Sequence, residues 1–277
     1  MLGKRLLRGL LALFAASAAA VAGAATQGTS RLDTVLQRGK VIVGVSSESP
    51  PFGFVNEQGQ LVGFDIDIAK LIARSLFGGK ESIEFVKQPF SARWANVKSG
   101  KVDFGIQLTT IYPDRLLNVA FTRSVMDSGI VIVTRGDVSV TKPADLNDPK
   151  YTVANLTAPV EKEISERLFP KAKRLTFDST AAEFAAVASR RADAATVDYP
   201  VAMYYAKTHK GIKVLKDWVT DPTHNAIFLQ QGDFKWWYYL DAMVGEMRGG
   251  SLYSQYSQIY KKWFGTVPKN LNLAGQD

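Results

Sequence analysis

The chain has 277 residues, of which 46% are hydrophobic and 22% are charged, a composition typical of a globular protein rather than of a disordered or membrane-embedded one. It contains no cysteine, which excludes disulfides, thiolate metal sites and a lipid anchor attached through cysteine. The formal net charge is +8, but the basic residues are scattered, so we expect a solvated basic surface and no nucleic-acid partner.

Residues 1–25 have the pattern of a cleavable secretory signal peptide. A basic start is followed by an uncharged Leu- and Ala-rich run from Gly9 to Val21, and small residues continue to Ala24. A permanent membrane anchor is the alternative, and it is less favoured because much of the run is Ala and Gly. We therefore expect export to the periplasm and removal of this segment.

After the signal, short β-branched runs alternate with amphipathic stretches, a pattern typical of an α/β protein. Buried strands are predicted at Val41 to Val45, Glu84 to Val86 and Val102 to Ile106. Between them we predict one helix capped by Asp65 and another that carries Trp94 and ends at Ser99. This succession predicts parallel strands with crossover helices.

The same alternation starts again after residue 150 and predicts a second α/β block. The expected strands are Tyr151 to Ala154, Arg174 to Phe177 and Ala194 to Val197. The expected helices are Pro159 to Leu168, Ala181 to Ser189 and Val201 to Lys207. Two C-terminal helices, Phe234 to Met247 and Leu252 to Trp263, are separated by a pair of glycines.

Two similar segments flank the second block, at residues 130–137 (IVIVTRGD) and 226–233 (AIFLQQGD). We interpret them as paired crossover strands between two lobes, with the second lobe inserted into the first; ordinary core strands of one domain are the alternative. The expected division is a signal at 1–25, a first lobe at 26–133 plus 228–277, and a second lobe at 134–227.

Short motifs spread over the mature chain carry a family resemblance. In chain order they are Pro50-Pro51-Phe52, Gly63-Phe64-Asp65, Ser99-Gly100-Lys101-Val102-Asp103, Thr109-Thr110-Ile111-Tyr112-Pro113-Asp114-Arg115, Val119-Ala120-Phe121-Thr122, Ala192-Asp193-Ala194 and Lys262-Trp263-Phe264-Gly265. In this order the sequence resembles the amino-acid-binding periplasmic solute-binding proteins of ABC importers, bacterial extracellular solute-binding protein family 3. The resemblance implies a two-lobed type 2 periplasmic-binding fold, in which two Rossmann-like lobes are joined by two crossover strands. It also implies an inner-membrane ABC permease as partner, and we expect a monomer.

A free amino acid needs a partner for each of its two charges when it is buried. The resemblance places the carboxylate clamp at Arg115, a side chain that can form two parallel hydrogen bonds, with the hydroxyl of Thr110 beside it. Asp198, which could also be a simple helix cap, stands where the family accepts hydrogen bonds from the ammonium. Thr157 and Ala158 stand where the second lobe offers a helix N-terminus to the carboxylate, although the usual glycine is missing.

Other positions bear on the choice of ligand. Ser49 replaces the aromatic residue that often precedes the family's Pro-Phe, which here ends in Phe52, and Ser46 replaces an acid that some members use for basic side chains. Both departures count against a Lys- or Arg-type ligand. Arg93 falls where binders of acidic amino acids place a second arginine, and a solvated helix charge is an equal alternative. We therefore expect glutamate or aspartate, with glutamine and other neutral amino acids still open.

Ser49 and Phe52 are expected to contact the ligand. Two positions after the third strand, Gln107 and Leu108, are also expected to face it. The main alternative function is an enzyme on the same fold, resembling cyclohexadienyl or arogenate dehydratases, for which Glu48 would be the candidate general acid. Binding is favoured over catalysis because Asp198 remains available to accept the ammonium. Since the two histidines lie apart and phosphate, dinucleotide, zinc and calcium motifs are missing from the sequence, we expect no metal, no cofactor and no catalytic residue.

Overall fold

The strands form two five-stranded sheets in the computed structural model, which describes residues 29–157 and 159–268. The expected signal peptide and Ala158 lie outside the described residues. The strands of the first sheet are β1 (Val41–Val45), β5 (Ile83–Lys87), β6 (Phe104–Gly105), β7 (Ala120–Phe121) and β15 (Phe228–Leu229). They pair in the order β5-β1-β6-β15-β7.

Parallel pairing dominates the middle of this first sheet. Strand β1 pairs with β5 along its whole length and with β6 at Val43 and Gly44. The helices that accompany the sheet are α2 (Arg31–Arg38), α3 (Phe64–Leu76), α4 (Arg93–Lys98), α5 (Pro113–Leu116), α9 (Phe234–Gly249) and α10 (Tyr253–Phe264). The predicted strands and helices of this block are therefore present, although β6 is shorter than expected.

One predicted helix start is wrong in a way that matters for the site. Helix α3 begins at Phe64 after Gly63, whose φ of +143° and close approach to the Phe52 carbonyl leave no room for a side chain. Asp65 therefore lies inside the first turn instead of capping it. Its carboxylate is buried and accepts a hydrogen bond from the backbone N–H of Leu108.

The second sheet contains β9 (Ile130–Arg135), β10 (Thr152–Leu156), β11 (Lys173–Phe177), β12 (Ala194–Asp198) and β13 (Ile212–Trp218), paired in the order β11-β10-β12-β9-β13. Strand β10 pairs parallel with both β11 and β12. The accompanying helices are α6 (Pro159–Leu168), α7 (Thr180–Ala188) and α8 (Tyr199–Thr208). These elements follow the predicted strand–helix alternation, with α6 at the predicted bounds.

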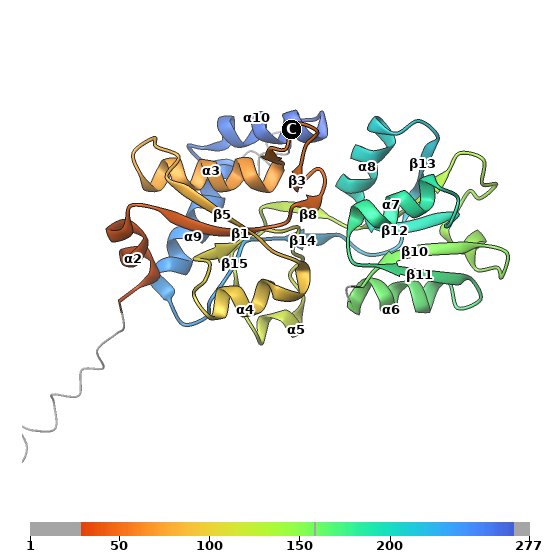
Figure 1. Cartoon of the computed structure of the whole chain (residues 1–277), viewed down its shortest axis with the longest axis horizontal. Coiled ribbons are helices and arrows are strands. Elements are labelled where there is room, and N and C mark those ends of the chain that lie inside the picture. Colours follow the sequence, from red (N-terminus) through yellow and green to blue (C-terminus); the bar gives the residue numbers. More distant parts are fainter. Residues whose placement is uncertain (1–28, 158, 269–277) are drawn as a thin grey trace, which may run out of the picture. The chain divides into compact units, whose positions relative to one another are not determined.

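Strands outside the two sheets connect the lobes or extend the first one. The chain passes between the lobes at β8 (Met126–Ser128) and β14 (Thr223–Asn225), which pair antiparallel with each other (Figure 1). A small separate sheet is formed by β2 (Glu48–Ser49), β3 (Gly53–Val55) and β4 (Leu61–Val62). The two-lobed α/β fold with two crossover strands is thus confirmed. In the described part of the chain no helix is long and apolar enough to cross a membrane.

The crossover strands are not the ones that the sequence indicated. The expected pair at 130–137 and 226–233 does not pair at all, because β9 lies between β12 and β13 while β15 lies between β6 and β7. The lobe boundary expected between Val133 and Thr134 falls inside β9, whose register with β12 is continuous there. We therefore propose that the lobes meet at β8 and β14, a few residues earlier on both passages.

Candidate functional site

A pocket of about 470 Å³ lies between the two lobes and is lined by residues that follow the carboxyl ends of parallel strands in both sheets. This edge is where open α/β sheets bind ligands. The lining residues are Phe90, Ser91, Arg93, Trp94, Leu108, Thr110, Tyr112, Arg115, Ile130, Leu156, Thr157, Asp178 and Asp198. Most of the expected ligand-binding residues are therefore brought together in one place.

Arg115 reaches the pocket from the short helix α5, which starts at Pro113 as a preorganised first residue. Its Nη1 donates a hydrogen bond to the Thr110 carbonyl at 2.8 Å, and its guanidinium lies 4.8 Å from the centre of the Tyr112 ring. Both contacts restrict the side chain to the pocket wall. A guanidinium is the kind of group that binds a carboxylate through two parallel hydrogen bonds.

The loop after β6 is held in an unusual conformation at Leu108, whose φ is +40°. A non-glycine residue with positive φ needs support from its surroundings. The support is the hydrogen bond of 3.0 Å from the Leu108 N–H to the Asp65 carboxylate. Burial raises the pKa of Asp65 to about 7, an effect that this hydrogen bond partly opposes.

Ionisation of Asp65 should therefore destabilise the folded protein as the pH rises. The folded-state pKa lies above that of the unfolded chain, so the parent protein should lose stability relative to Asp65→Asn as the pH passes through 7. We expect this relative loss to be about 2 kcal/mol between about pH 5.5 and about pH 8.5. Urea denaturation of both proteins measures it, and an unchanged difference at the two pH values would contradict this role of Asp65.

Asp198 ends β12 and faces the pocket from the second lobe. The residue is 7% exposed, and its carboxylate accepts a hydrogen bond of 2.7 Å from the Ser128 hydroxyl. The side chain makes no helix-capping hydrogen bond, so the simple capping role is wrong. Burial raises the pKa of Asp198 to about 6, while the Ser128 hydroxyl and the charge of Arg115 act in the opposite direction.

Two threonines line the pocket in different settings. Thr110 is buried, and its hydroxyl donates a hydrogen bond of 3.0 Å to the Asn225 side-chain carbonyl. Thr157 is exposed on the pocket wall, and its backbone N–H already donates to the Phe177 carbonyl. In Thr157 it is therefore the hydroxyl, and not the backbone N–H, that is available to a ligand.

Arg93 is 8% exposed, so it is not the solvated helix charge that was one of its two interpretations. Its guanidinium lies 4.3 Å from the centre of the Trp94 ring and 5.3 Å from that of Phe90. Trp94 also packs edge-to-face on Phe228, with ring centres 5.0 Å apart, so it is a half-buried residue that packs against the core and forms part of the pocket wall. A cation held against two aromatic rings can meet a ligand side chain at low cost in entropy.

Three expected residues lie elsewhere. Ser49 is buried and accepts a hydrogen bond from Ser46, and it lines a neighbouring cavity instead of this pocket. Phe52 is a core residue, packed between Phe64 and Phe264 with ring centres 6.0 and 5.8 Å away. Gln107 turns inward, because its side-chain carbonyl accepts a hydrogen bond from the Gln88 side chain and its Nε2 donates to the Gln88 backbone carbonyl.

Sequence reasoning missed several residues of the pocket wall, among them Phe90 and Asp178. Asp178 directly follows β11, and its exposed carboxylate has no hydrogen-bonding or ionic partner among the described residues. Its position in the sequence could have identified Asp178, because it follows one predicted parallel strand just as Asp198 ends another. Within residues 29–157 and 159–268, His, Cys, Asp and Glu form no group of three that could hold a metal ion.

Comparisons with known proteins agree with this architecture. The family described as bacterial extracellular solute-binding proteins, family 3, matches residues 41–266. The ABC transporter glutamine-binding protein of Bacillus subtilis is 25% identical, over 86% of this chain and 85% of its own length. The L-cystine-binding protein of Escherichia coli is also 25% identical, over 95% of this chain and 96% of its own length.

A solved structure extends the likeness to three dimensions. An ancestral amino acid-binding protein, described as a precursor of cyclohexadienyl dehydratase, superposes with a TM-score of 0.77. It is 32% identical in sequence and covers 85% of this chain and 100% of its own. The likeness therefore extends over most of the two-lobed fold.

Proposed function

Because this chain belongs to family 3 of the bacterial extracellular solute-binding proteins, the amino-acid-binding components of ABC importers, we propose that it carries a polar L-amino acid in the interlobe pocket to an inner-membrane permease. The single observation that supports this choice is that Arg115 and Asp198, which carry opposite charges, line the same pocket. We further propose that it acts as a monomer in the periplasm, without a cofactor and without catalysing a reaction.

Arg115 and Asp198 each bind one of the two charges of the zwitterion. Arg115 and the hydroxyl of Thr110 hold the α-carboxylate from the first lobe, and Thr157 adds its hydroxyl from the second. Asp198 accepts hydrogen bonds from the ammonium. Each ligand charge then leaves water with an opposite charge beside it, which offsets the cost of burial.

Binding and closure are linked in this proposal. The lobes move as hinged bodies about β8 and β14, because crossover segments are where a two-lobed protein can absorb backbone rotation. Closure removes water from the pocket, and the charge-assisted hydrogen bonds become stronger in the lower dielectric. The closed protein presents both lobes to the permease.

The ligand side chain is proposed to lie near Arg93, which favours glutamate or aspartate. A second observation supports a different choice, because Asp178 brings a carboxylate to the same pocket. A side chain that both accepts and donates hydrogen bonds, such as the amide of glutamine, would suit Arg93 together with Asp178. The two candidates differ in how each variant at these positions should behave.

Titration of the parent protein with glutamate and glutamine tests the function and the ligand together. If the ligand is acidic, Arg93→Ala should weaken glutamate binding about 30-fold, because a buried carboxylate loses its charged partner. Asp178→Asn should then strengthen glutamate binding by removing a repulsive charge. Loss of glutamine affinity in both variants would instead identify the amide as the ligand. Failure of the parent to bind any amino acid would overturn the proposed function.

A dehydratase on this fold is the competing function, and the position of the nominated acid counts against it. Glu48 is exposed on β2 and lines the neighbouring cavity, while Arg115 and Asp198 line the proposed binding pocket. A general acid must come within hydrogen-bond reach of the group that it protonates. Incubation with prephenate or arogenate should therefore yield no aromatic product.

A further inference from the structure

The two crossover strands form a ribbon, here meaning β8 and β14, with two different faces. In β8, Met126 and Ser128 are buried while Asp127 between them is exposed. In β14, Asn225 is buried while the neighbouring His224 is exposed. Since side chains alternate along a strand, the ribbon has an inner face toward the protein and an outer face toward solvent.

The inner face contacts both halves of the ligand site. The Ser128 hydroxyl donates to Asp198 at 2.7 Å, and the Asn225 side chain accepts from Thr110 at 3.0 Å. Thr110 also forms an isolated antiparallel bridge with Asn225. The backbone N–H of Ile111 donates to the His224 carbonyl at 2.9 Å. The ligand-binding loop of the first lobe is therefore a continuation of the ribbon.

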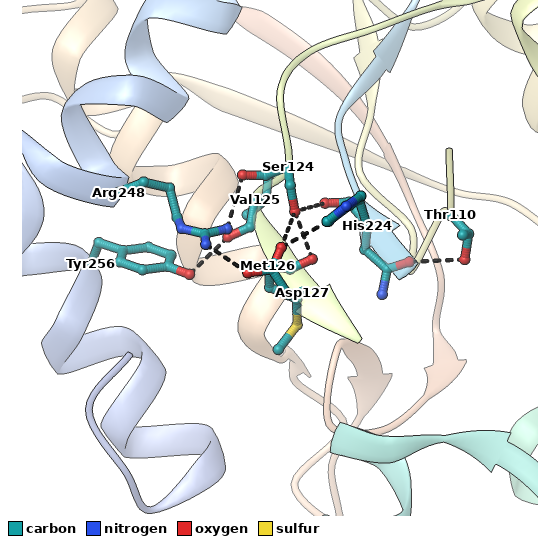
Figure 2. A network of polar contacts seen from close by, with 9 residues as sticks. Thr110, Ser124, Val125, Met126, Asp127, His224, Arg248 and Tyr256 are labelled. Atoms are coloured by element: carbon teal, nitrogen blue, oxygen red, sulfur yellow. Dashed lines mark hydrogen bonds and ion pairs between the residues drawn. The ribbon is translucent and has the colours of Figure 1, made fainter. Parts of the chain in front are cut away.

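A polar network attaches Asp127 of the outer face, and the two residues just before the ribbon, to the first lobe (Figure 2). Asp127 receives hydrogen bonds from His224 and Arg248, both 2.9 Å long. Arg248, on α9, also donates to the Ser124 carbonyl, and the Tyr256 hydroxyl of α10 donates to the Val125 carbonyl. These contacts fix where the inner side chains lie relative to the first lobe.

We propose that Ser128 and Asn225 are positioning residues, through which the hinge ribbon orients Asp198 and Thr110 for the ligand. This inference rests on the proposed function and goes beyond it, because it gives the hinge a direct part in recognition. Ser128 orients the ammonium acceptor, and Asn225 orients the hydroxyl donor for the carboxylate. Movement of the ribbon during closure then adjusts both sides of the site together.

An amide at position 225 can either accept a hydrogen bond from the Thr110 hydroxyl or donate one to it. A threonine hydroxyl has a single hydrogen, and in this structure Thr110 gives it to the Asn225 carbonyl oxygen. The Asn225 Nδ2 atom is buried with no hydrogen-bond partner among the described residues. Rotation of the amide by half a turn lets Nδ2 donate to Thr110. This pairs the buried N–H and releases the hydroxyl hydrogen for the ligand carboxylate.

Ser128 acts on the opposite charge of the ligand. Its hydroxyl donates to the carboxylate of Asp198, which stabilises the ionised form that an ammonium requires. The other charged groups on the pocket wall are Arg93, Arg115 and Asp178. Substitution of Ser128 leaves these three groups in place, so a change in the pH dependence of binding reports on Asp198.

The first test compares Ser128→Ala and Ser128→Thr with the parent by calorimetric titration across pH, using the amino acid that the parent binds. Ser128→Ala should bind about tenfold more weakly at neutral pH, and the midpoint of its pH dependence should rise by about one unit. Ser128→Thr retains the hydroxyl and should keep both the affinity at neutral pH and the midpoint of the pH dependence at the parental values. An Ala variant with the parental midpoint would overturn the role of Ser128.

The second test uses Asn225→Asp, which keeps the size of the side chain but removes the donor. Asn225→Asp and Thr110→Val should each weaken binding at least about tenfold, and the double variant should be no weaker than the worse single one. If the losses of affinity in the two single variants multiply in the double variant, the introduced carboxylate acts by charge repulsion alone, and Asn225 does not position the Thr110 hydroxyl. Parental affinity in Asn225→Asp would overturn this role as well. Circular dichroism and thermal unfolding show whether each variant is folded.

These outcomes separate the inference from the function on which it rests. If the parent binds an amino acid with an affinity that falls in Arg115→Lys, while the Ser128 and Asn225 variants bind as the parent does, the result rejects only the role of the ribbon. A parent that binds no amino acid rejects the proposed function and the inference with it.

Discussion

An Arg115→Lys variant should bind its amino acid about 100-fold more weakly than the parent, although the positive charge is kept. The planar fork of arginine can hold both carboxylate oxygens at once, while an ammonium group acts as a point charge. Lysine also lacks the geometry to donate to the Thr110 carbonyl and bind a ligand in the same plane, as Arg115 can. Isothermal titration of both proteins measures the difference directly.

Arg190→Lys is a matched control for this experiment. The Arg190 side chain is 71% exposed and pairs with Asp137 on the surface of the second lobe. Its replacement by lysine should leave ligand affinity within about twofold of the parent, because surface ion pairs contribute little. Equal affinity in Arg115→Lys and Arg190→Lys would mean that Arg115 does not hold the carboxylate.

The regular elements could be predicted from sequence because their burial follows their pattern. Strand β1 coincides with the predicted apolar run at Val41–Val45, and α6 coincides with its predicted bounds at Pro159–Leu168. Strand β6 is shorter than the apolar run around it, since only Phe104–Gly105 forms the ladder with its neighbours. Hydrogen bonding to partners distant in sequence, which a local pattern does not contain, decides such boundaries.

The crossover was misplaced for a related physical reason. A fully apolar strand such as β9 fits the middle of either sheet, so its residues do not reveal the sheet to which it belongs. The actual crossover strands are only three residues long, and their sequences, MDS and THN, are mostly polar. Their inner and outer faces follow from the pairing of β8 with β14, which the sequence alone does not show.

The lining of the pocket was predicted more completely than the crossover, because the family motifs identify positions that follow parallel strands. Arg115, Thr110 and Asp198 were predicted in this way, and all three line one pocket. Phe90 and Asp178 were missed, since neither belongs to a motif that carries a known role. A position in a motif does not identify a ligand contact when the side chain there turns into the protein interior. Phe52 and Ser49 are both buried in this way.

The second large effect is expected at Asp198, where binding and stability should change in opposite directions. Asp198→Asn keeps the shape of the side chain and an acceptor for Ser128, but removes the charge that an ammonium needs. Binding should weaken about 100-fold, as expected when a buried charge loses its partner. The pKa of Asp198 is raised by burial to about 6, so at pH 7 its ionisation destabilises the empty protein.

The sign of this effect follows from proton linkage. A carboxyl group with a folded-state pKa above its unfolded value contributes full stability below the unfolded value and loses it as the pH rises through the folded one. Asp198→Asn should therefore raise the free energy of unfolding at pH 7 by up to about 3 kcal/mol, and this gain should disappear near pH 4. Urea denaturation without ligand at both pH values provides the measurement.

The same titration should govern binding by the parent protein. Below about pH 6 the ammonium must compete with a proton for Asp198, so affinity should fall by about tenfold for each further unit of pH. Glutamine is a suitable probe if it binds, because its side chain does not ionise in this range. Binding near pH 6 should also release a proton, which calorimetry in buffers of different ionisation enthalpy detects. If affinity is the same at pH 5 and pH 7, Asp198 is not the acceptor for the ammonium, and the zwitterion must be held in another way.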